Sequence, residues 1–67
     1  MITVTINGER RHLERSMACA ELVETLGLAG KRIALERNGE IVPRSAYPQR
    51  EITDGDTLEI VVAVGGG

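Results

Sequence analysis

The chain has few of the residues that stabilise small proteins through covalent or metal cross-links. Its 67 residues include one cysteine, Cys19, and one histidine, His12. A single thiol excludes an internal disulfide, and a lone histidine beside it speaks against a zinc site. The fold must therefore come from regular secondary structure around an aliphatic core, in a single domain of marginal size.

Aromatic residues are also scarce, and basic residues do not outnumber acidic ones. Tyr47 is the only aromatic residue, and the formal net charge is −2. Nucleic-acid binding needs stacking side chains and a basic surface, so we expect no nucleic-acid partner. The one basic cluster, at 10–15, is diluted by Glu9 and Glu14 and is interpreted as a solvated strand face. With no signal-peptide pattern, no apolar run long enough to span a bilayer and a lone thiol, we expect a cytoplasmic protein. We also expect it to be monomeric when alone.

Alternation of β-branched and polar residues predicts a strand over Ile2–Ile6. Asn7-Gly8 follows directly, and both residues tolerate positive φ, so a tight turn should lead into a return strand at 9–13. Leu13 is the only clear core residue of that return strand.

The second half of the chain predicts three more strands. Segments 33–37 and 40–42 flank the turn signal Asn38-Gly39, and Pro43 stops the second of them. Residues 43–50 predict a loop with one helical turn. The last strand is expected over 57–64, with Leu58 and the even-numbered residues after it facing the core.

One helix is predicted between the two halves. Its apolar stripe has the i, i+3, i+4, i+7 spacing of an amphipathic helix and consists of Cys19, Leu22, Val23 and Leu26. Ser16 is the only good capping side chain nearby; a later start would put Ala18 at the cap, without a side-chain hydrogen bond. Gly27 and Gly30 mark the C-terminal end.

This element order predicts an α+β fold, the β-grasp or ubiquitin-like roll. A mixed sheet of four to five strands should pack on one main helix, with the first and last strands parallel at its centre. Residues 1–64 would form this domain, and 65–67 a flexible C-terminal tail.

The three glycines of that tail are the most informative feature of the chain. Without a Cβ, Gly65 and Gly66 can lie in a narrow channel, and three extended residues reach roughly 10 Å. We expect the tail to carry the α-carboxylate of Gly67 into the active site of another protein. No nucleophile–base pair stands elsewhere in the chain, so we expect a protein substrate and not an enzyme.

A docking surface is predicted beside the tail. The last strand is apolar on both faces near its end, and one helix can cover only one face of the sheet. We expect Val61 and Ala63 to form an exposed apolar patch. Asp54, Asp56 and Glu59 would form an acidic rim that attracts a basic partner, although the Asp54–Asp56 segment is also a turn signal.

Several motifs give the chain a family resemblance. The most specific are Ile41-Val42-Pro43-Arg44 and Val64-Gly65-Gly66-Gly67. Weaker ones are Ile6-Asn7-Gly8-Glu9, Glu21-Leu22, Tyr47 and Asp54-Gly55-Asp56. Together they resemble the ThiS family of ubiquitin-like sulfur carriers of thiamin (thiazole) biosynthesis. Ala18 departs from the pattern, because that family often has a capping threonine before the helix glutamate.

The resemblance implies a function and its partners. A ThiF-like adenylyltransferase would use ATP and Mg²⁺ to adenylate the Gly67 carboxylate, while the chain itself holds no cofactor. Sulfur from a cysteine desulfurase would then give a Gly67 thiocarboxylate, which a ThiG-like thiazole synthase would consume. Gly65 and Gly66 would be recognised through their backbone, so a Cβ at Gly66 should impair adenylation.

Three other functions remain open from the sequence. A MoaD-like subunit for molybdopterin synthesis would share the tail, although the short length and proline-free last strand argue against it. A ubiquitin-like modifier would start with the same chemistry, and an interaction module would leave the tail inert. Cys19 is interpreted as a core residue, while Arg44 and Tyr47 are equally compatible with partner contacts and with loop packing.

Overall fold

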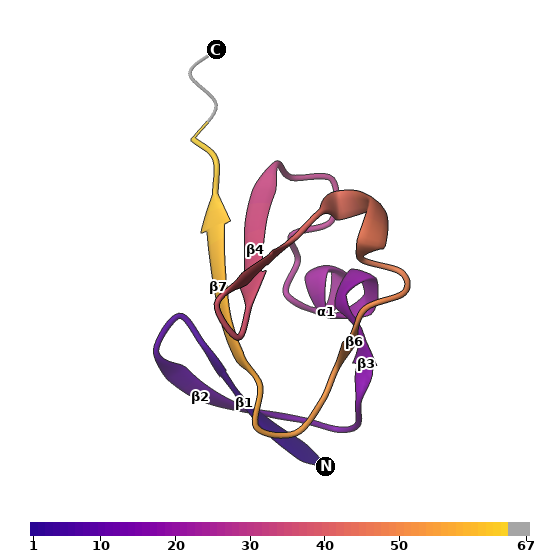
Figure 1. Ribbon diagram of the computed structural model, residues 1–67, viewed down its shortest axis with the longest axis vertical. Coiled ribbons are helices and arrows are strands. Elements are labelled where there is room, and N and C mark those ends of the chain that lie inside the picture. The colour runs from indigo at the N-terminus through magenta and orange to yellow at the C-terminus, as the bar shows by residue number, and fades with distance from the viewer. Residues whose placement is uncertain (65–67) are drawn as a thin grey trace.

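Five strands form one mixed sheet, and a short helix lies across one of its faces (Figure 1). A computed structural model describes residues 1–64 of the chain. Within them the strand order of this sheet is β2-β1-β7-β4-β5. Its strands are β1 (Ile2–Ile6), β2 (Glu9–Leu13), β4 (Ile33–Arg37), β5 (Glu40–Val42) and β7 (Thr57–Val62).

The two predicted hairpins are confirmed. β1 pairs antiparallel with β2, and β4 with β5. Asn7 and Asn38 have φ of 52° and 51°, and each is followed by a glycine with positive φ. Paired positive φ values match the turn to the twist of the flanking strands, which is why these Asn-Gly pairs fix both registers.

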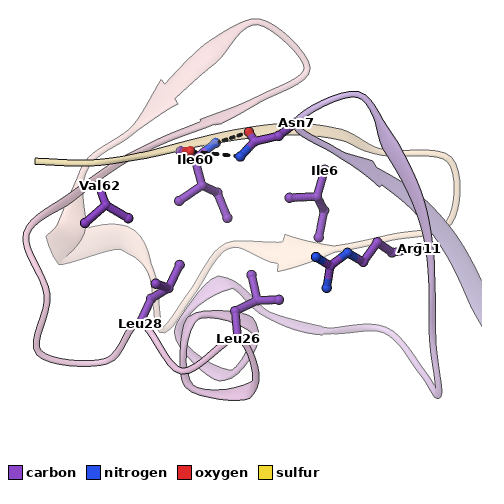
Figure 2. Close-up of a pocket in the computed structure, with 7 residues that line it drawn as sticks. All are labelled: Ile6, Asn7, Arg11, Leu26, Leu28, Ile60 and Val62. Atoms are coloured by element: carbon purple, nitrogen blue, oxygen red, sulfur yellow. Dashed lines mark hydrogen bonds between the residues drawn. The ribbon is translucent and has the colours of Figure 1, made fainter.

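β1 and β7 run parallel at the centre of the sheet, as the topology predicted. Their backbone pairing covers only Thr5↔Thr57 and Ile6↔Leu58. The side chain of Asn7 then extends the ladder by one step (Figure 2). Its Nδ2 donates to the Ile60 carbonyl at 3.0 Å, and its Oδ1 accepts from the Ile60 N–H at 2.8 Å. An amide side chain thus replaces a strand residue where the chain turns away, a role the turn signal did not reveal.

β7 is shorter than predicted. The strand ends at Val62, opposite the first residue of β4, Ile33. The N–H of Ala63 still donates to the Arg32 carbonyl at 2.9 Å. Val64 was expected to face the core, yet it is 95% exposed. The alternation continues in the sequence, but the neighbouring strand does not extend far enough to cover it.

The helix α1 (Cys19–Thr25) starts at the later of the two positions considered. Ala18 is its N-cap and makes no side-chain cap hydrogen bond. Ser16 instead donates its hydroxyl to the Ile52 carbonyl. The predicted apolar stripe is confirmed for Cys19, Leu22 and Val23, which are buried.

A second, two-stranded sheet was missed. It pairs β3 (Met17–Ala18) with β6 (Glu51–Ile52) in antiparallel orientation. Two-residue strands carry no readable alternation, so only the tertiary structure shows them. Between β5 and β6, a 3-10 turn over Arg44–Ala46 confirms the predicted helical turn.

The core lies between the sheet and α1 and is almost entirely aliphatic. Leu22, Leu35, Ile52 and Leu58 are fully buried. Tyr47 is 7% exposed and belongs to this core, so its ring packs the loop and is not an exposed contact. In residues 1–64, no helix combines the length and apolarity that a membrane crossing requires.

Candidate functional site

β7 presents two chemically different faces. Leu58 and Ile60 point into the core and are 0% and 7% exposed. Glu59 and Val61 point outward, away from α1, because successive side chains of a strand alternate between the two faces of its sheet. Ala63 continues the outward set and is exposed. The predicted exposure of Val61 and Ala63 is therefore confirmed.

Neighbouring strands enlarge this apolar surface. The β4–β7 register places Ala34 directly opposite Val61. In the next row of the same face, Glu36 of β4 lies between Glu59 of β7 and Ile41 of β5. Val61 and Ile41 are 64% and 65% exposed. We call Ala34, Ile41, Val61 and Ala63 the outer-face patch.

Ala34 and Ile41 were missed in the sequence. A usable signal existed, because the Asn38-Gly39 turn fixes the β4–β5 register and so places Ile41 on the face of Glu36. The pairing of β4 with β7, by contrast, joins segments far apart in the chain and required the structure.

The predicted acidic residues do not form one rim. Glu59 lies beside Val61 on the outer face. Asp54 lies in the turn before β7, and the extended segment 57–63 alone separates that turn from Ala63 by about 20 Å. Its Oδ1 accepts a hydrogen bond from the Thr3 N–H at 2.8 Å. Only Glu59 is therefore placed to accompany the outer-face patch.

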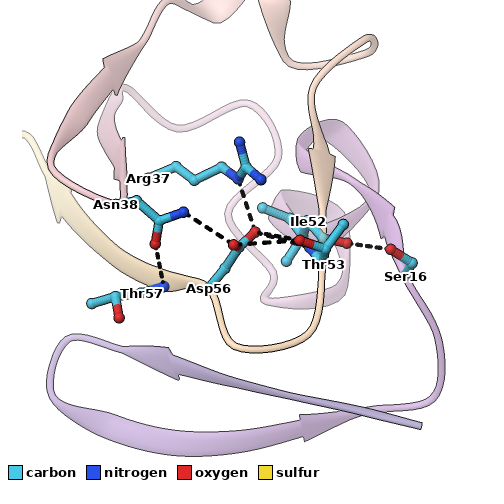
Figure 3. A network of polar contacts seen from close by, with 7 residues as sticks. All are labelled: Ser16, Arg37, Asn38, Ile52, Thr53, Asp56 and Thr57. Atoms are coloured by element: carbon cyan, nitrogen blue, oxygen red, sulfur yellow. Dashed lines mark hydrogen bonds and ion pairs between the residues drawn. The ribbon is translucent and has the colours of Figure 1, made fainter.

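Asp56 corrects the prediction outright, because it is buried. The residue is 6% exposed, and its side chain lies at the centre of a polar network (Figure 3). Arg37 Nε donates to its carboxylate at 2.8 Å, Asn38 Nδ2 at 3.0 Å and the Thr53 N–H at 2.9 Å. A carboxylate with all these donors ties β4 to the turn before β7 and is not available to a partner.

The charge state of this network follows from its contacts. Burial on its own raises the pKa of Asp56. The Thr53 backbone N–H, the Arg37 guanidinium and the Asn38 amide outweigh burial and lower that pKa below its ordinary value. The same hydrogen bond raises the pKa of Arg37. Asp56 is thus ionised at neutral pH and has a structural role.

Two further side chains with potentially reactive groups, Cys19 and Tyr47, lie in the core. Cys19 is fully buried, and burial raises the pKa of its thiol, which disfavours the nucleophilic thiolate. Burial likewise raises the pKa of Tyr47. Across the described part of the chain, no three His, Cys, Asp or Glu side chains are grouped to hold a metal ion.

The chain leaves the fold beside the outer-face patch. Beyond β7, Ala63 and Val64 lead away from the body of the molecule (Figure 1). The predicted sites at Gly65, Gly66 and Gly67 lie outside the described residues.

Comparison with known proteins decides the family. The family model described as "ThiS family" matches residues 4–67. The chain belongs to the ThiS family. A sulfur carrier protein ThiS of Thermus thermophilus is 36% identical over 64 residues, covering 96% of this chain and 98% of that protein. The similarity to this ThiS protein therefore covers nearly the whole length of both chains.

Structural comparison confirms the β-grasp fold. The crystal structure of the thiamine biosynthesis protein (ThiS) from Geobacter metallireducens superposes with a TM-score of 0.85 at 30% identity. The match covers 98% of this chain and 100% of that one. The predicted mixed sheet on one helix is thus the architecture of a solved ThiS protein.

A third relative has a different organisation. A thiazole synthase of Paramagnetospirillum magneticum is 48% identical over 64 residues. These residues are 96% of this chain, but the chain spans only about a fifth of that protein, 20% of its length. A ThiS-like segment therefore occurs within a longer protein that is named for thiazole synthesis.

Proposed function

We propose that this ThiS-family protein is a sulfur carrier for thiamin thiazole synthesis, with the C-terminal carboxyl group of Gly67 as the sulfur-bearing group. The observation that carries the proposal is the family match over residues 4–67, which includes all three glycines. The likeness to the sulfur carrier of Thermus thermophilus along 98% of that protein supports it. These relatives favour the ThiS assignment over the MoaD-like, modifier and inert-tail alternatives.

The proposed chemistry requires activation of the Gly67 carboxylate by a partner. A free carboxylate resists nucleophilic attack because of its charge and resonance. A ThiF-like enzyme would join it to the AMP moiety of ATP in the presence of Mg²⁺, with loss of pyrophosphate. Sulfur of a cysteine-desulfurase persulfide would then attack the acyl carbon and expel AMP. The product of this attack is an acyl disulfide between Gly67 and the desulfurase cysteine. A second thiol would then attack the cysteine sulfur of that bond, which releases the thiocarboxylate on Gly67 and leaves a disulfide on the enzyme.

The chain's contribution is binding and presentation, which makes it a protein substrate and not an enzyme. The outer-face patch provides apolar area next to the exit of the chain from the fold, and Glu59 adds a negative charge beside it. Such a patch is suited to a transient interface with a charged rim. Gly65 and Gly66 would be read through their backbone inside the channel of the partner.

We infer that the sulfur acceptor is a ThiG-like thiazole synthase. The support is the thiazole synthase of Paramagnetospirillum magneticum, which contains a segment 48% identical to this chain. A covalent link between two domains raises the effective concentration of one at the other, as expected for a donor and its acceptor. A free thiol and these partners fit a cytoplasmic location.

Intact mass spectrometry of the protein purified from its native cells tests the proposal. The expected result is a species heavier by the exchange of one oxygen for one sulfur, localised by fragmentation to Gly67. A Gly67 that stays unmodified in cells starved of thiamin would contradict the proposal. Gly66→Ala should reduce ATP-dependent pyrophosphate release by the ThiF-like enzyme, with Ala29→Gly as the control for a small-residue change at an exposed loop position.

A further inference from the structure

One backbone edge of β7 lacks a strand partner at Val62. In an antiparallel pair, hydrogen bonds alternate along each strand. The Ala63 N–H donates to the carbonyl of Arg32, just before β4. The backbone N–H and carbonyl of the preceding residue, Val62, therefore point to the opposite side of β7, toward β1. There β1 has already turned away, and the Asn7 side chain reaches only Ile60. Within residues 1–64, no strand covers this edge.

A pocket of about 190 Å³ adjoins the same edge. It lies between the sheet and the C-terminal end of α1, as Figure 2 shows. Most of its lining residues are aliphatic, although polar atoms contribute about half of the exposed lining; the residues are Ile6, Asn7, Arg11, Leu26, Leu28, Ile60 and Val62. Leu26 and Leu28 are only partly buried, so the pocket can take an aliphatic side chain from outside.

Arg11 gives the pocket a positive charge. It lies opposite Val4 in the β1–β2 pair, on the face of the sheet that turns toward the core. Its guanidinium points into the space lined by Ile6 and Leu26 (Figure 2). Glu9 is its only ion-pair partner among the described residues, at 3.8 Å, beyond hydrogen-bond distance. A second carboxylate can therefore bind this guanidinium.

We propose that this edge and pocket, which we call the edge groove, bind an extended segment of a partner protein. The segment pairs with the Val62 N–H and carbonyl as an additional strand. One of its side chains is aliphatic and enters the pocket, and a second, two residues away on the same face, is a carboxylate that binds Arg11. Main-chain pairing provides affinity in such complexes, while alternate side chains provide specificity.

The position of the edge groove explains why a partner would use it. Val61 belongs to the outer-face patch and Val62 to the edge groove, so the two surfaces lie on opposite faces of one strand. A partner could contact both faces of β7 just before the glycines. Binding at the edge groove needs no sulfur chemistry and is therefore independent of the function proposed for Gly67.

A peptide titration tests the proposal directly. The probe is acetyl-Thr-Leu-Thr-Glu-Thr-amide, followed by NMR of the full ¹⁵N,¹³C-labelled chain; the same peptide with lysine for glutamate is the control. We expect shifts at the Val62 amide and the Leu28 methyl groups with the glutamate peptide, and weaker binding of the lysine peptide. Concentration-dependent Val62 shifts without peptide would instead assign the groove to a second copy of the chain and overturn the proposal.

Matched variants separate the groove from its surroundings. Arg11→Gln should weaken glutamate-peptide binding roughly two- to fivefold, the range of a partly exposed ion pair. Arg10→Gln, on the opposite face of the same strand, should leave binding unchanged. Val62→Pro removes the edge donor without removing a β4–β7 bond, and should abolish the Leu28 shifts in a chain that still gives a dispersed spectrum.

Three further results would overturn the proposal. One is the absence of Val62 shifts at millimolar glutamate peptide with the unmodified chain, a result that does not depend on any variant folding. Another is equal binding of the glutamate and lysine peptides. The third is a set of shifts centred on Val61 and Ile41, which would place the peptide on the outer face instead.

Discussion

Replacing Asp56 should destabilise this small protein far more than replacing Asp54, although both stand in one Asp-Gly-Asp turn. Asp56→Ala removes the acceptor of three hydrogen bonds shorter than or equal to 3.0 Å, from Arg37, Asn38 and Thr53. It also leaves the guanidinium of Arg37, whose side chain is 27% exposed, without its carboxylate. Asp54→Ala removes one exposed hydrogen bond, from the Thr3 N–H.

The magnitudes follow from these contacts. Removing one partner of a buried charged pair costs about 3–5 kcal/mol, and partial exposure of Arg37 places Asp56→Ala near the lower end. Loss of one exposed hydrogen bond costs about 0.5–1.5 kcal/mol. A chain of this length has an unfolding free energy on the order of 3–10 kcal/mol. Asp56→Ala should therefore lower the Tm by about 12–24 °C, at 4–8 °C per kcal/mol.

Thermal and urea unfolding at pH 7, followed by circular dichroism, measure both variants under identical conditions. Asp56→Asn adds a useful intermediate, because it keeps the shape and some acceptor capacity while losing the charge. An Asp56→Ala chain no less stable than Asp54→Ala would refute the reasoning. In that case the carboxylate network would not hold β4 to the turn before β7.

Three further predictions concern charge, the central ladder and docking. The pKa of Asp56 is lower in the folded state than in the unfolded chain. The stability that its carboxylate contributes is therefore complete above the ordinary carboxyl pKa and is lost as the pH falls through the folded pKa. Between pH 7 and pH 2, the urea midpoint should fall less for Asp56→Asn than for the unmodified chain. Asn7→Ala should lower the free energy of unfolding, measured in urea, by about 1–3 kcal/mol, because alanine is strained at positive φ and cannot make the two hydrogen bonds to Ile60. Asn7→Gly should relieve the strain but still lack the two hydrogen bonds. Equal stability of the three chains would contradict this. Val61→Asp should lower kcat/KM for adenylation by the ThiF-like enzyme about tenfold, or about 1.4 kcal/mol, with an unchanged Tm. The exposed-loop change Ala29→Asp should have no such effect, and similar losses in both variants would argue against docking through the outer face.

Local signals were sufficient for most of the elements. The alternation in Ile2–Ile6, the helical spacing from Cys19 and the two Asn-Gly pairs each depend on neighbours in the chain, and the structure confirms all of them. Prediction failed for very short elements and for a strand end that depends on a distant segment. β3 and β6 are two residues long each, and β7 ends at Val62 because β4 starts at Ile33.

The candidate site divides in the same way. The exposure of Val61 could be predicted, because one helix leaves one sheet face uncovered. Which of the two aspartates is buried could not be predicted, because both are acidic and both flank the same glycine. Arg37 and Asn38, which lie 19 and 18 residues before Asp56, decide that it is buried.

Residue identity and local spacing were enough to establish the family, the helix and the five main strands, and the chemistry of the three glycines. Which groups are available to a partner became visible only in the folded molecule. Burial, strand ends and free edges depend on segments that the chain brings together from far apart. That is why Asp56 proved structural, Ile41 joined the outer-face patch, and the edge groove at Val62 could be recognised at all.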